Sequence, residues 1–323
     1  MVNKIYNIIL IGCGYWGKNY IKLLTNLIDK YNFIGIAELN QDIINNIKKT
    51  YPNINIYKNY KEALDLVDIC IVATPISTHY SIIKSCLENN KHVIVEKPFT
   101  NSYEKSLELN NIAKKNNLHI FVNFTPIYTN PYSYIYDNYK NKLNDIFYIN
   151  CIRTNLGIIR PDCNVIYDLT CHDIAMVIYL LDELPDENSI KISTKKCYSD
   201  NVDIAFINMN FPKNNILCSF YTSWVDNKKE RSFTIVSKND KLIYNDIDTI
   251  NSIKINKSNI QKDIDNFIYN QGDTIIPIQT YNEPLRNQLE HYYQCLTQNI
   301  KCKTDSEFAL KIDKILELIN SKI

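Results

Sequence analysis

The first third of the chain alternates short apolar runs with stretches whose apolar residues recur at helical spacing. The apolar runs predict strands at 8–11, 33–37, 54–57, 69–73, 92–95 and 119–122. The stretches between them predict helices at 20–28, 41–50, 60–66 and 101–116, and one ending near residue 90. Runs that are apolar throughout are typical of parallel strands covered on both faces. This alternation predicts an α/β domain with a doubly wound parallel sheet over residues 1–123.

From residue 124 onward the pattern changes. Helices are predicted at 131–141 and 165–181, with a strand at 146–153 between them. Between about 188 and 256 one strand-like segment follows another without a long helix, and helices at 283–298 and 304–319 close the chain. We therefore predict a second, α+β domain over 124–323 with a large, mostly antiparallel open sheet.

Composition and charge exclude several classes of protein. The formal net charge is +1 and 45% of the residues are hydrophobic, so no charge excess favours nucleic acid or an anionic membrane. No run approaches the ~20 apolar residues that a membrane span needs. The ten cysteines are scattered and form no C-x-x-C pair. Reduced thiols in a cytoplasmic protein, with no metal site, are the expectation.

The first predicted strand leads into a glycine turn. Gly12, Gly14 and Gly17 follow it at G-x-G-x-x-G spacing, with Tyr15 and Trp16 completing the turn, and a predicted helix comes next. The first glycine permits a tight turn, the second lets phosphates approach the backbone, and the third allows close packing of helix and strand. The turn is predicted to hold a dinucleotide pyrophosphate; a tight turn without a ligand is the alternative.

An acidic residue ends the second predicted strand. Glu38 lies about 20 residues beyond the glycine turn, where dinucleotide-binding folds place the carboxylate that contacts the adenosine ribose. This carboxylate would repel a 2′-phosphate, and no arginine follows it, so we expect NAD as the cofactor rather than NADP. A solvated loop glutamate is the alternative.

Polar residues follow the later predicted strands of the first domain. Ligands of doubly wound sheets bind beyond the carboxyl ends of the strands. The residues there that we expect to line the cofactor are Thr74, Pro75, His79, Glu96, Lys97 and Asn123.

Three residues are candidates for catalysis. Lys97 precedes a proline at a strand end, and Asp168 and His172 lie four residues apart on one face of a predicted helix. Imidazole titrates near neutrality, and a nearby carboxylate would orient it, so His172 is a candidate proton acceptor. A surface lysine and a helix-surface Asp/His pair without a task are the alternatives.

A polar cluster precedes that helix. It contains Arg153, Asn155, Arg160 and Asn164, and guanidinium groups suit the bidentate binding of a carboxylate or diphosphate. We expect these residues to bind substrate; a loop held by its own salt bridges is the alternative.

Taken in order, these motifs resemble the glucose–fructose oxidoreductase / inositol dehydrogenase / MocA family. The matching motifs are G-C-G-Y-W-G (12–17), A-T-P-I-S-T-H (73–79), E-K-P (96–98) and D-L-T-C-H-D (168–173). The segment N-L-G-I-I-R-P-D-C-N-V-I-Y-D-L (155–169) is similar to the branch that oxidises nucleotide-linked sugars at C3. One departure is Asn123-Phe124, where such relatives often carry glycine-histidine.

The resemblance implies a Rossmann domain that binds NAD and a second domain that binds a nucleotide sugar. The implied reaction oxidises C3 of a UDP-linked N-acetylated amino sugar or its uronic acid, with hydride transfer to the nicotinamide. In it, His172 accepts the hydroxyl proton, Lys97 contacts the oxygen, and Asp168 orients the imidazole. All three would contact substrate, and a homodimer or homotetramer would form through the carboxyl-terminal sheet. A non-catalytic sensor of dinucleotide or sugar, and a dehydrogenase of a free sugar or cyclitol, are the alternatives.

Overall fold

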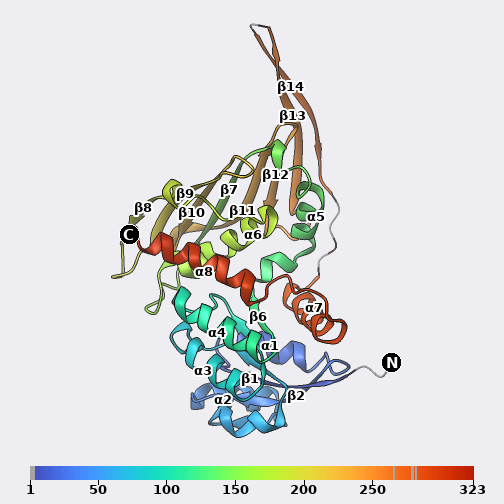
Figure 1. Cartoon of the computed structure of the whole chain (residues 1–323), viewed down its shortest axis with the longest axis vertical. Helices are drawn as coiled ribbons and strands as arrows, with labels where there is room; N and C mark the ends of the chain where they lie inside the picture. Colours follow the sequence, from blue (N-terminus) through green and yellow to red (C-terminus); the bar gives the residue numbers. More distant parts are fainter. Residues whose placement is uncertain (1–3, 265, 278–279, 281) are drawn as a thin grey trace. The chain divides into compact units, whose positions relative to one another are not determined.

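The computed structural model describes residues 4–264, 266–277, 280 and 282–323. The chain divides into two compact units (Figure 1). The first contains the residues up to Phe124 together with Leu285–Asp313, and the second contains Thr125–Pro284 together with Lys314–Ile323. Among the described helices, none has both the length and the apolar composition needed to cross a membrane.

The first unit is built on a six-stranded sheet in which every pairing is parallel. Its strands are β1 (Tyr6–Ile11), β2 (Tyr31–Ala37), β3 (Ile56–Tyr57), β4 (Ile69–Val72), β5 (His92–Glu96) and β6 (Ile120–Asn123). The strand order β3-β2-β1-β4-β5-β6 confirms the predicted doubly wound sheet. The direction of winding reverses between β1 and β4, so the glycine turn after β1 lies where such folds bind ligands.

The helices of the first unit follow the predicted periodicity with small differences in length. They are α1 (Gly17–Leu24), α2 (Gln41–Thr50), the 3-10 helix η1 (Tyr60–Leu66), α3 (Ile76–Glu88) and α4 (Tyr103–Lys115). The side chain of Asn40 caps α2 by accepting hydrogen bonds from the amides of Asp42 and Ile43. Helix α1 ends at Leu24, four residues before the end expected from its apolar positions.

A late segment of the chain completes the first unit. Helix α7 (Pro284–Gln298) packs on it: the Tyr292 ring stacks on Phe121 at 4.4 Å between centroids, and its hydroxyl donates to the Val122 carbonyl at 2.9 Å. The Tyr31 hydroxyl donates to the Leu289 carbonyl at 2.7 Å. Residues 285–313 thus differ from the prediction that assigned all of 124–323 to the second domain. The division between the units falls within α8 (Ser306–Asn320).

The second unit contains an eight-stranded sheet in the order β14-β13-β12-β11-β7-β10-β9-β8. Its strands are β7 (Ile146–Leu156), β8 (Lys191–Lys195), β9 (Ile204–Phe211), β10 (Ile216–Ser223), β11 (Val225–Ser237), β12 (Asp240–Asn245), β13 (Ile253–Asp263) and β14 (Asn266–Ile275). Only the pairing of β7 with β10 is parallel among the described strands of this sheet. The mostly antiparallel sheet expected from the sequence is therefore confirmed.

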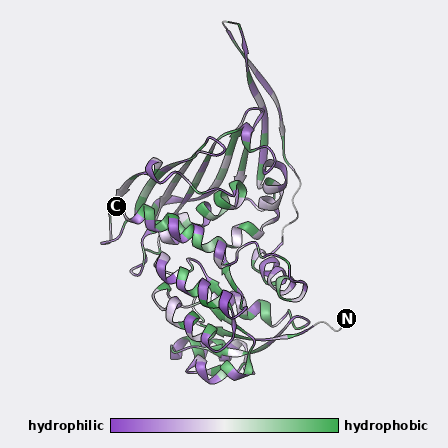
Figure 2. Ribbon diagram, in the orientation of Figure 1, coloured by the Kyte–Doolittle hydropathy of each residue, from purple (hydrophilic) through white to green (hydrophobic). Residues whose placement is uncertain are grey.

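Short helices accompany this sheet. Hydrophobic residues are frequent on α6 and along strands of both sheets (Figure 2). The helices are η2 (Thr125–Tyr128), α5 (Asn130–Tyr139), η3 (Leu143–Asp145), the π-helical turn η4 (Ile166–Thr170), α6 (Cys171–Leu181) and η5 (Glu187–Ser189).

Strands β13 and β14 form a long hairpin that extends beyond the other strands of the sheet (Figure 1). Every residue of β14 is exposed. The sequence pattern predicted strands only to about residue 256, because a hairpin exposed on both faces lacks the apolar side that marks a packed strand.

Candidate functional site

The glycine turn after β1 has the backbone that its spacing predicted. Gly12 has φ +88°, and a Cβ placed there would lie 2.6 Å from the Ala73 carbonyl oxygen. A Cβ on Gly17 would lie 2.5 Å from the Gly12 carbonyl oxygen, so this position is closed by packing. A Cβ on Gly14 would meet no described atom within 4 Å. The turn is therefore tight at its first and third glycines and open at the second.

Helix α1 begins directly after this turn. No capping side chain and no acidic residue of its first turn offsets the positive charge of its amino end. Trp16, at the N-cap, makes no side-chain capping hydrogen bond, and the first turn carries no acidic residue. The Tyr15 ring is 80% exposed and meets the Trp16 ring edge-on at 5.9 Å. The positive end of the helix dipole and its first amides suit an anion here.

The Glu38 carboxylate is held against the glycine turn. Its Oε2 accepts a hydrogen bond from the Cys13 amide at 2.8 Å, and its Oε1 accepts from the Leu39 and Asn40 amides at 2.8 and 2.9 Å. Burial, together with the charge of Glu38, raises the pKa of the Cys13 thiol to about 12, so this thiol stays neutral. The carboxylate is thus fixed beside the turn, at the carboxyl end of β2.

The buried imidazole of His79 contacts backbone carbonyl groups in the turns after β4 and β5. Its Nε2 lies 2.9 Å from the Thr74 carbonyl oxygen, and its Nδ1 lies 3.1 and 3.2 Å from those of Pro98 and Phe99. The side chain is 1% exposed, and burial lowers its pKa. The prediction placed His79 along the cofactor; the structure makes it a buried link between the turns after β4 and β5.

Thr74 and Pro75, which follow β4, lie nearer the surface. Thr74 is half-buried and its hydroxyl accepts a hydrogen bond from the Thr78 hydroxyl at 2.8 Å, while Pro75 is exposed at the N-cap of α3. Both are at the sheet edge where the glycine turn lies.

A buried polar network joins the ends of β5 and β6 to α1. Glu96 Oε1 accepts hydrogen bonds from the Tyr20 hydroxyl, at 3.0 Å, and from Asn123 Nδ2, which also donates to the Tyr20 oxygen at 2.9 Å. Burial raises the pKa of Glu96 although both of these partners lower it. Tyr20 was not among the predicted site residues, because only the fold brings its hydroxyl to Glu96, 76 residues later.

Two features of this edge fit a bound dinucleotide. The Asn123 Oδ1 atom is buried and makes no hydrogen bond to any described residue, so an acceptor is available at the end of β6. The space at Gly14 leaves the backbone open to a phosphate. Lys97, half-buried directly after Glu96, contributes the cation nearest to this network in the sequence.

In the second unit, Asp168 and His172 occupy the turn where η4 runs into α6. Asp168 Oδ2 accepts a hydrogen bond from the indole Nε1 of the buried Trp224 at 3.1 Å, and Oδ1 lies 3.0 Å from the Nε of Arg160 in an ion pair. The expected helix 165–181 thus begins with a π turn, a feature frequent at functional sites. Trp224 was not among the predicted site residues. That Asp168 orients His172 stays a prediction.

Arg153 occupies a different environment from the one predicted. Its guanidinium is buried and donates from Nε and Nη2 to Asp173, with distances of 2.8 to 3.1 Å. Burial raises the pKa of Asp173 even against the opposing effect of this ion pair. The guanidinium is thus already paired inside the unit, and that Arg153 also binds substrate stays a prediction.

The two asparagines of the polar cluster have local partners. Asn155 Nδ2 donates to the Gly157 carbonyl at 2.8 Å, and Asn164 Oδ1 accepts from the amides of Ile166 and Tyr167 at 3.1 Å each. Asn164 therefore starts η4, and the side chain of Arg160 remains 41% exposed beside Asp168.

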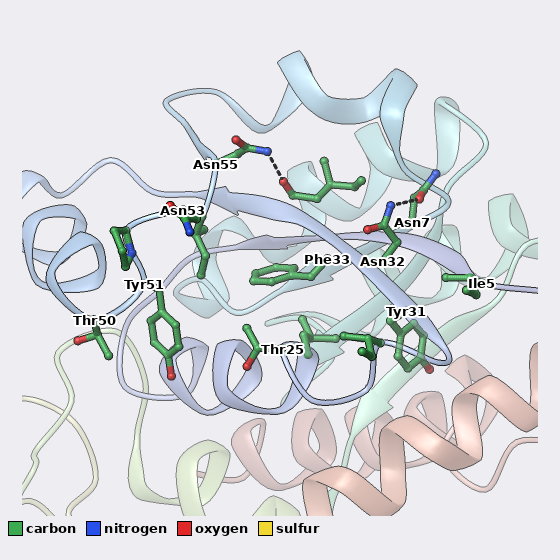
Figure 3. A pocket seen from close by; sticks show the side chains of 15 residues that line it. Ile5, Asn7, Thr25, Tyr31, Asn32, Phe33, Thr50, Tyr51, Asn53 and Asn55 are labelled. Carbon is green, nitrogen blue, oxygen red and sulfur yellow. Dashed lines mark hydrogen bonds between the residues drawn. The ribbon is translucent and has the colours of Figure 1, made fainter.

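One open pocket, of about 820 Å³, lies elsewhere in the first unit (Figure 3). It is lined by Ile5, Asn7, Leu24, Thr25, Ile28, Tyr31, Asn32, Phe33, Ile34, Thr50, Tyr51, Pro52, Asn53, Ile54 and Asn55. These residues include the amino ends of β1 and β2, whereas the glycine turn and Glu38 follow the carboxyl ends. The pocket is therefore distinct from the candidate cofactor site.

Comparison with known proteins gives the following likenesses. Residues 6–124 match the sequence family described as an oxidoreductase family with an NAD-binding Rossmann fold. The chain is 21% identical over 219 residues to scyllo-inositol 2-dehydrogenase (NADP(+)) IolW of Bacillus subtilis. This aligned segment covers 63% of this chain and 59% of that protein. The fold resembles that of UDP-N-acetylglucosamine 3-dehydrogenase GnnA from Acidithiobacillus ferrooxidans, with a TM-score of 0.83 at 16% identity over 99% of this chain and 98% of that one. It also resembles the WlbA dehydrogenase from Bordetella pertussis, whose structure contains NADH and UDP-GlcNAcA, with a TM-score of 0.78 at 14% identity over 98% and 96% of the two chains.

The curated relatives are matched over only part of their length. The aligned segments span between 20% and 64% of those proteins, and the similarity to the two solved structures concerns the fold. The match of residues 6–124 to the family model places this segment in the oxidoreductase family with an NAD-binding Rossmann fold. It confirms for this segment the family expected from the sequence motifs.

Proposed function

We propose that the protein is an NAD-dependent dehydrogenase that oxidises a sugar hydroxyl. The observation that carries this proposal is the glycine turn, tight at Gly12 and Gly17 and open at Gly14, with the Glu38 carboxylate anchored on the Cys13 amide beside it. An open second glycine next to a fixed acidic residue suits both a pyrophosphate and the hydroxyls of an adenosine ribose.

The first unit supplies the residues that would hold the cofactor. The turn 12–17 and the start of α1 would bind the pyrophosphate, and Glu38 the ribose. Thr74, Lys97 and Asn123 would face the remainder from the ends of β4, β5 and β6. When bound, NAD supplies the acceptor for the hydride that leaves the substrate carbon. The negative charge of Glu38 favours NAD over NADP because it repels a 2′-phosphate.

The family resemblance assigns a separate role to each catalytic candidate. His172 takes up the proton of the substrate hydroxyl, and Lys97 stabilises the oxygen that this proton leaves. General acid–base assistance of this kind contributes ~10²–10⁴ in rate. Asp168, which contacts Trp224 and Arg160, orients the imidazole of His172 in this scheme.

For the substrate we propose a UDP-linked N-acetylated amino sugar or its uronic acid, oxidised at C3. This is supported by the fold shared with GnnA and with the WlbA dehydrogenase that contains UDP-GlcNAcA. The partly exposed guanidinium of Arg160 is a candidate group for an anionic substrate. The match to IolW favours a cyclitol as the second candidate.

The test is to mix the purified protein with NAD and a panel of substrates, and to record NADH by its absorbance. The panel contains UDP-N-acetylglucosamine, its uronic acid, UDP alone, and the inositols. A single-turnover measurement is included because NADH that stays bound would hide steady-state turnover. We expect reduction of NAD by a UDP sugar, with Lys97→Ala and His172→Ala each slower by at least about 100-fold.

A matched control and two contrary results complete this test. Lys105→Ala, at an exposed position of α4, removes a lysine outside the candidate site and should leave the rate unchanged. NAD binding without reduction by any substrate would favour a sensor over an enzyme. Reduction by an inositol, with no competition from UDP, would overturn the substrate but retain the dehydrogenase.

A further inference from the structure

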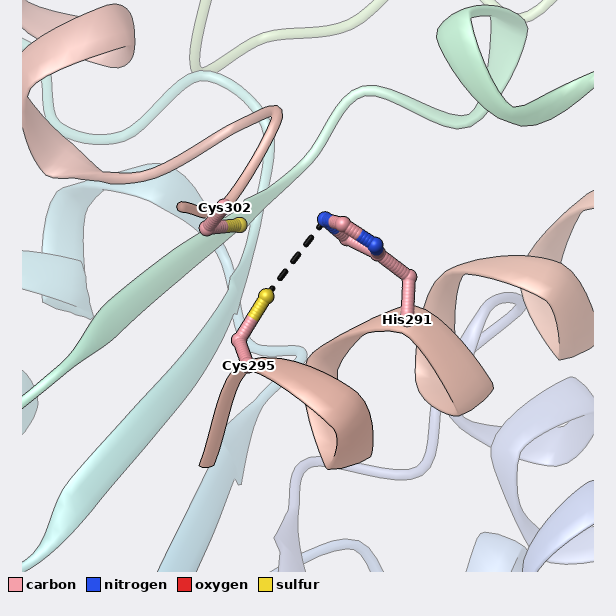
Figure 4. A group of neighbouring side chains, drawn as sticks. All are labelled: His291, Cys295 and Cys302. Atoms are coloured by element: carbon pink, nitrogen blue, oxygen red, sulfur yellow. Dashed lines mark hydrogen bonds between the residues drawn. The ribbon is translucent and has the colours of Figure 1, made fainter. Parts of the chain in front are cut away.

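A group of soft ligands comes together where α7 leads into the segment before α8. His291 and Cys295 lie one turn apart on α7, and Cys302 comes from the segment that follows (Figure 4). One ligand atom from each lies within 4.8 Å of the other two, and Cys295 Sγ is 3.4 Å from His291 Nε2. Figure 4 shows the imidazole and both sulfur atoms directed toward a common point.

The spacing matches the coordination sphere of zinc. With Zn–S bonds of about 2.3 Å and Zn–N bonds of about 2.0–2.1 Å, tetrahedral angles separate sulfur from nitrogen by about 3.5 Å and two sulfurs by about 3.8 Å. The separation of 3.4 Å between Cys295 and His291 is close to the first value. Two cysteines and a histidine are also the ligand types that zinc selects over magnesium or calcium.

Backbone amides contact two of these three side chains. The Thr304 amide lies 3.4 Å from Cys302 Sγ and donates to it. Cysteine binds metals as thiolate, so binding of an ion here would release the thiol protons. The Lys303 amide donates to His291 Nε2 at 3.2 Å, so a metal ion would have to replace that hydrogen bond.

We propose that His291, Cys295 and Cys302 bind a zinc ion that fastens the end of α7 to the segment preceding α8, with water as the fourth ligand. The sequence pattern predicted no metal site, because the cysteines form no C-x-x-C pair and the histidines show no regular spacing. The H-x₃-C pair on α7 acquires its third ligand only through the fold. This proposal is independent of the dehydrogenase activity.

The position of the site indicates what the ion would do. Tyr292, adjacent to His291, donates to the Val122 carbonyl, and the Thr304 carbonyl accepts from the Val122 amide at 2.9 Å. The ligands therefore flank the contacts that join this segment to β6. An ion here would stabilise the folded first unit rather than take part in hydride transfer.

The experiment measures zinc in the full-length protein. The chain is purified under reducing conditions, stripped with a chelator, titrated with zinc, and analysed by elemental mass spectrometry and thermal unfolding. A parallel titration uses cobalt, whose thiolate charge-transfer absorption reports sulfur ligation. We expect one metal ion per chain and a zinc-dependent rise in the melting temperature.

Variants locate the ion. Cys302→Ser and His291→Gln should each weaken zinc binding by at least about 100-fold, beyond the ~10–100-fold caused by loss of an outer-sphere partner. Cys86→Ser is the matched control, because Cys86 and Cys70 are a buried cysteine pair that joins no three-ligand cluster among the described residues. His291→Gln keeps the test valid if the serine variant does not fold, since His291 is only half-buried.

Three outcomes would overturn the proposal: no stoichiometric zinc binding, unchanged binding in His291→Gln, or an equal loss in Cys86→Ser. A Cys295–Cys302 disulfide found by mass spectrometry in protein exposed to glutathione disulfide, with no zinc bound by the reduced chain, would assign the pair to redox chemistry instead.

Discussion

Replacing Gly14 by alanine separates cofactor binding from folding. The new Cβ would meet no described atom within 4 Å, and Gly14 has no left-handed backbone angle, so the fold has room for it. Alanine also restricts the unfolded chain, so we expect the free energy of unfolding to stay within about 1 kcal/mol of the wild type or to rise slightly.

The same methyl group occupies the space through which a pyrophosphate would approach the turn. Losing one hydrogen bond between a charged group and the backbone costs about 1.5–3 kcal/mol, which corresponds to a roughly 10- to 100-fold weaker affinity. Gly17→Ala is the contrasting variant: its Cβ would lie 2.5 Å from the Gly12 carbonyl oxygen, so we expect about 1–3 kcal/mol of destabilisation.

Fluorescence titration with NADH and urea unfolding, applied to both variants, give the two quantities. If Gly14→Ala bound NADH as tightly as the wild type, the assignment of this turn to the pyrophosphate would be refuted. If Gly17→Ala were as stable as the wild type, the packing account of the third glycine would be wrong.

Further predictions concern stability, cofactor choice and assembly. Asp173→Asn leaves the buried guanidinium of Arg153 without its counter-charge, so urea unfolding should show a loss of about 3–5 kcal/mol, whereas the double variant R153M/D173L should lie close to the wild type; an unchanged D173N would contradict this. Burial lowers the pKa of His92 from 6.5 to about 4. The unfolded chain therefore binds the proton more readily, and stability should fall by up to about 3 kcal/mol as the pH drops from about 6.5 to about 4. His92→Gln should flatten that dependence. Glu38→Gln should lower the preference for NADH over NADPH in binding titrations, and an unchanged ratio would remove Glu38 from the ribose site. Light scattering should detect a homodimer or homotetramer; a monomer at all concentrations would overturn assembly through the sheet.

The first sheet and the glycine turn could be predicted because their signals are local. A strand such as β4 is buried along its whole length and reads as an uninterrupted apolar run. The turn requires glycine where a Cβ would meet Ala73 or Gly12 backbone atoms. The carboxyl ends of parallel strands then share one edge, which brings Glu38 to the glycine turn.

The remainder depended on contacts between residues far apart in the sequence. The burial of Arg153 and its pairing with Asp173, 20 residues later, could not be read from the residues around it. Trp224 contacts Asp168 from the link between β10 and β11, 56 residues later in the chain. The same limitation hid the meeting of Cys302 with α7.

Residues 285–313 belong to the first unit although they lie far from its other residues in the sequence, which limits where the chain can be truncated. A fragment that stops at Phe124 would expose the ring of Phe121 and leave the Val122 carbonyl without its tyrosine donor. We therefore expect that the first unit does not fold stably without residues 285–313. Any chimera or truncation must include this late segment.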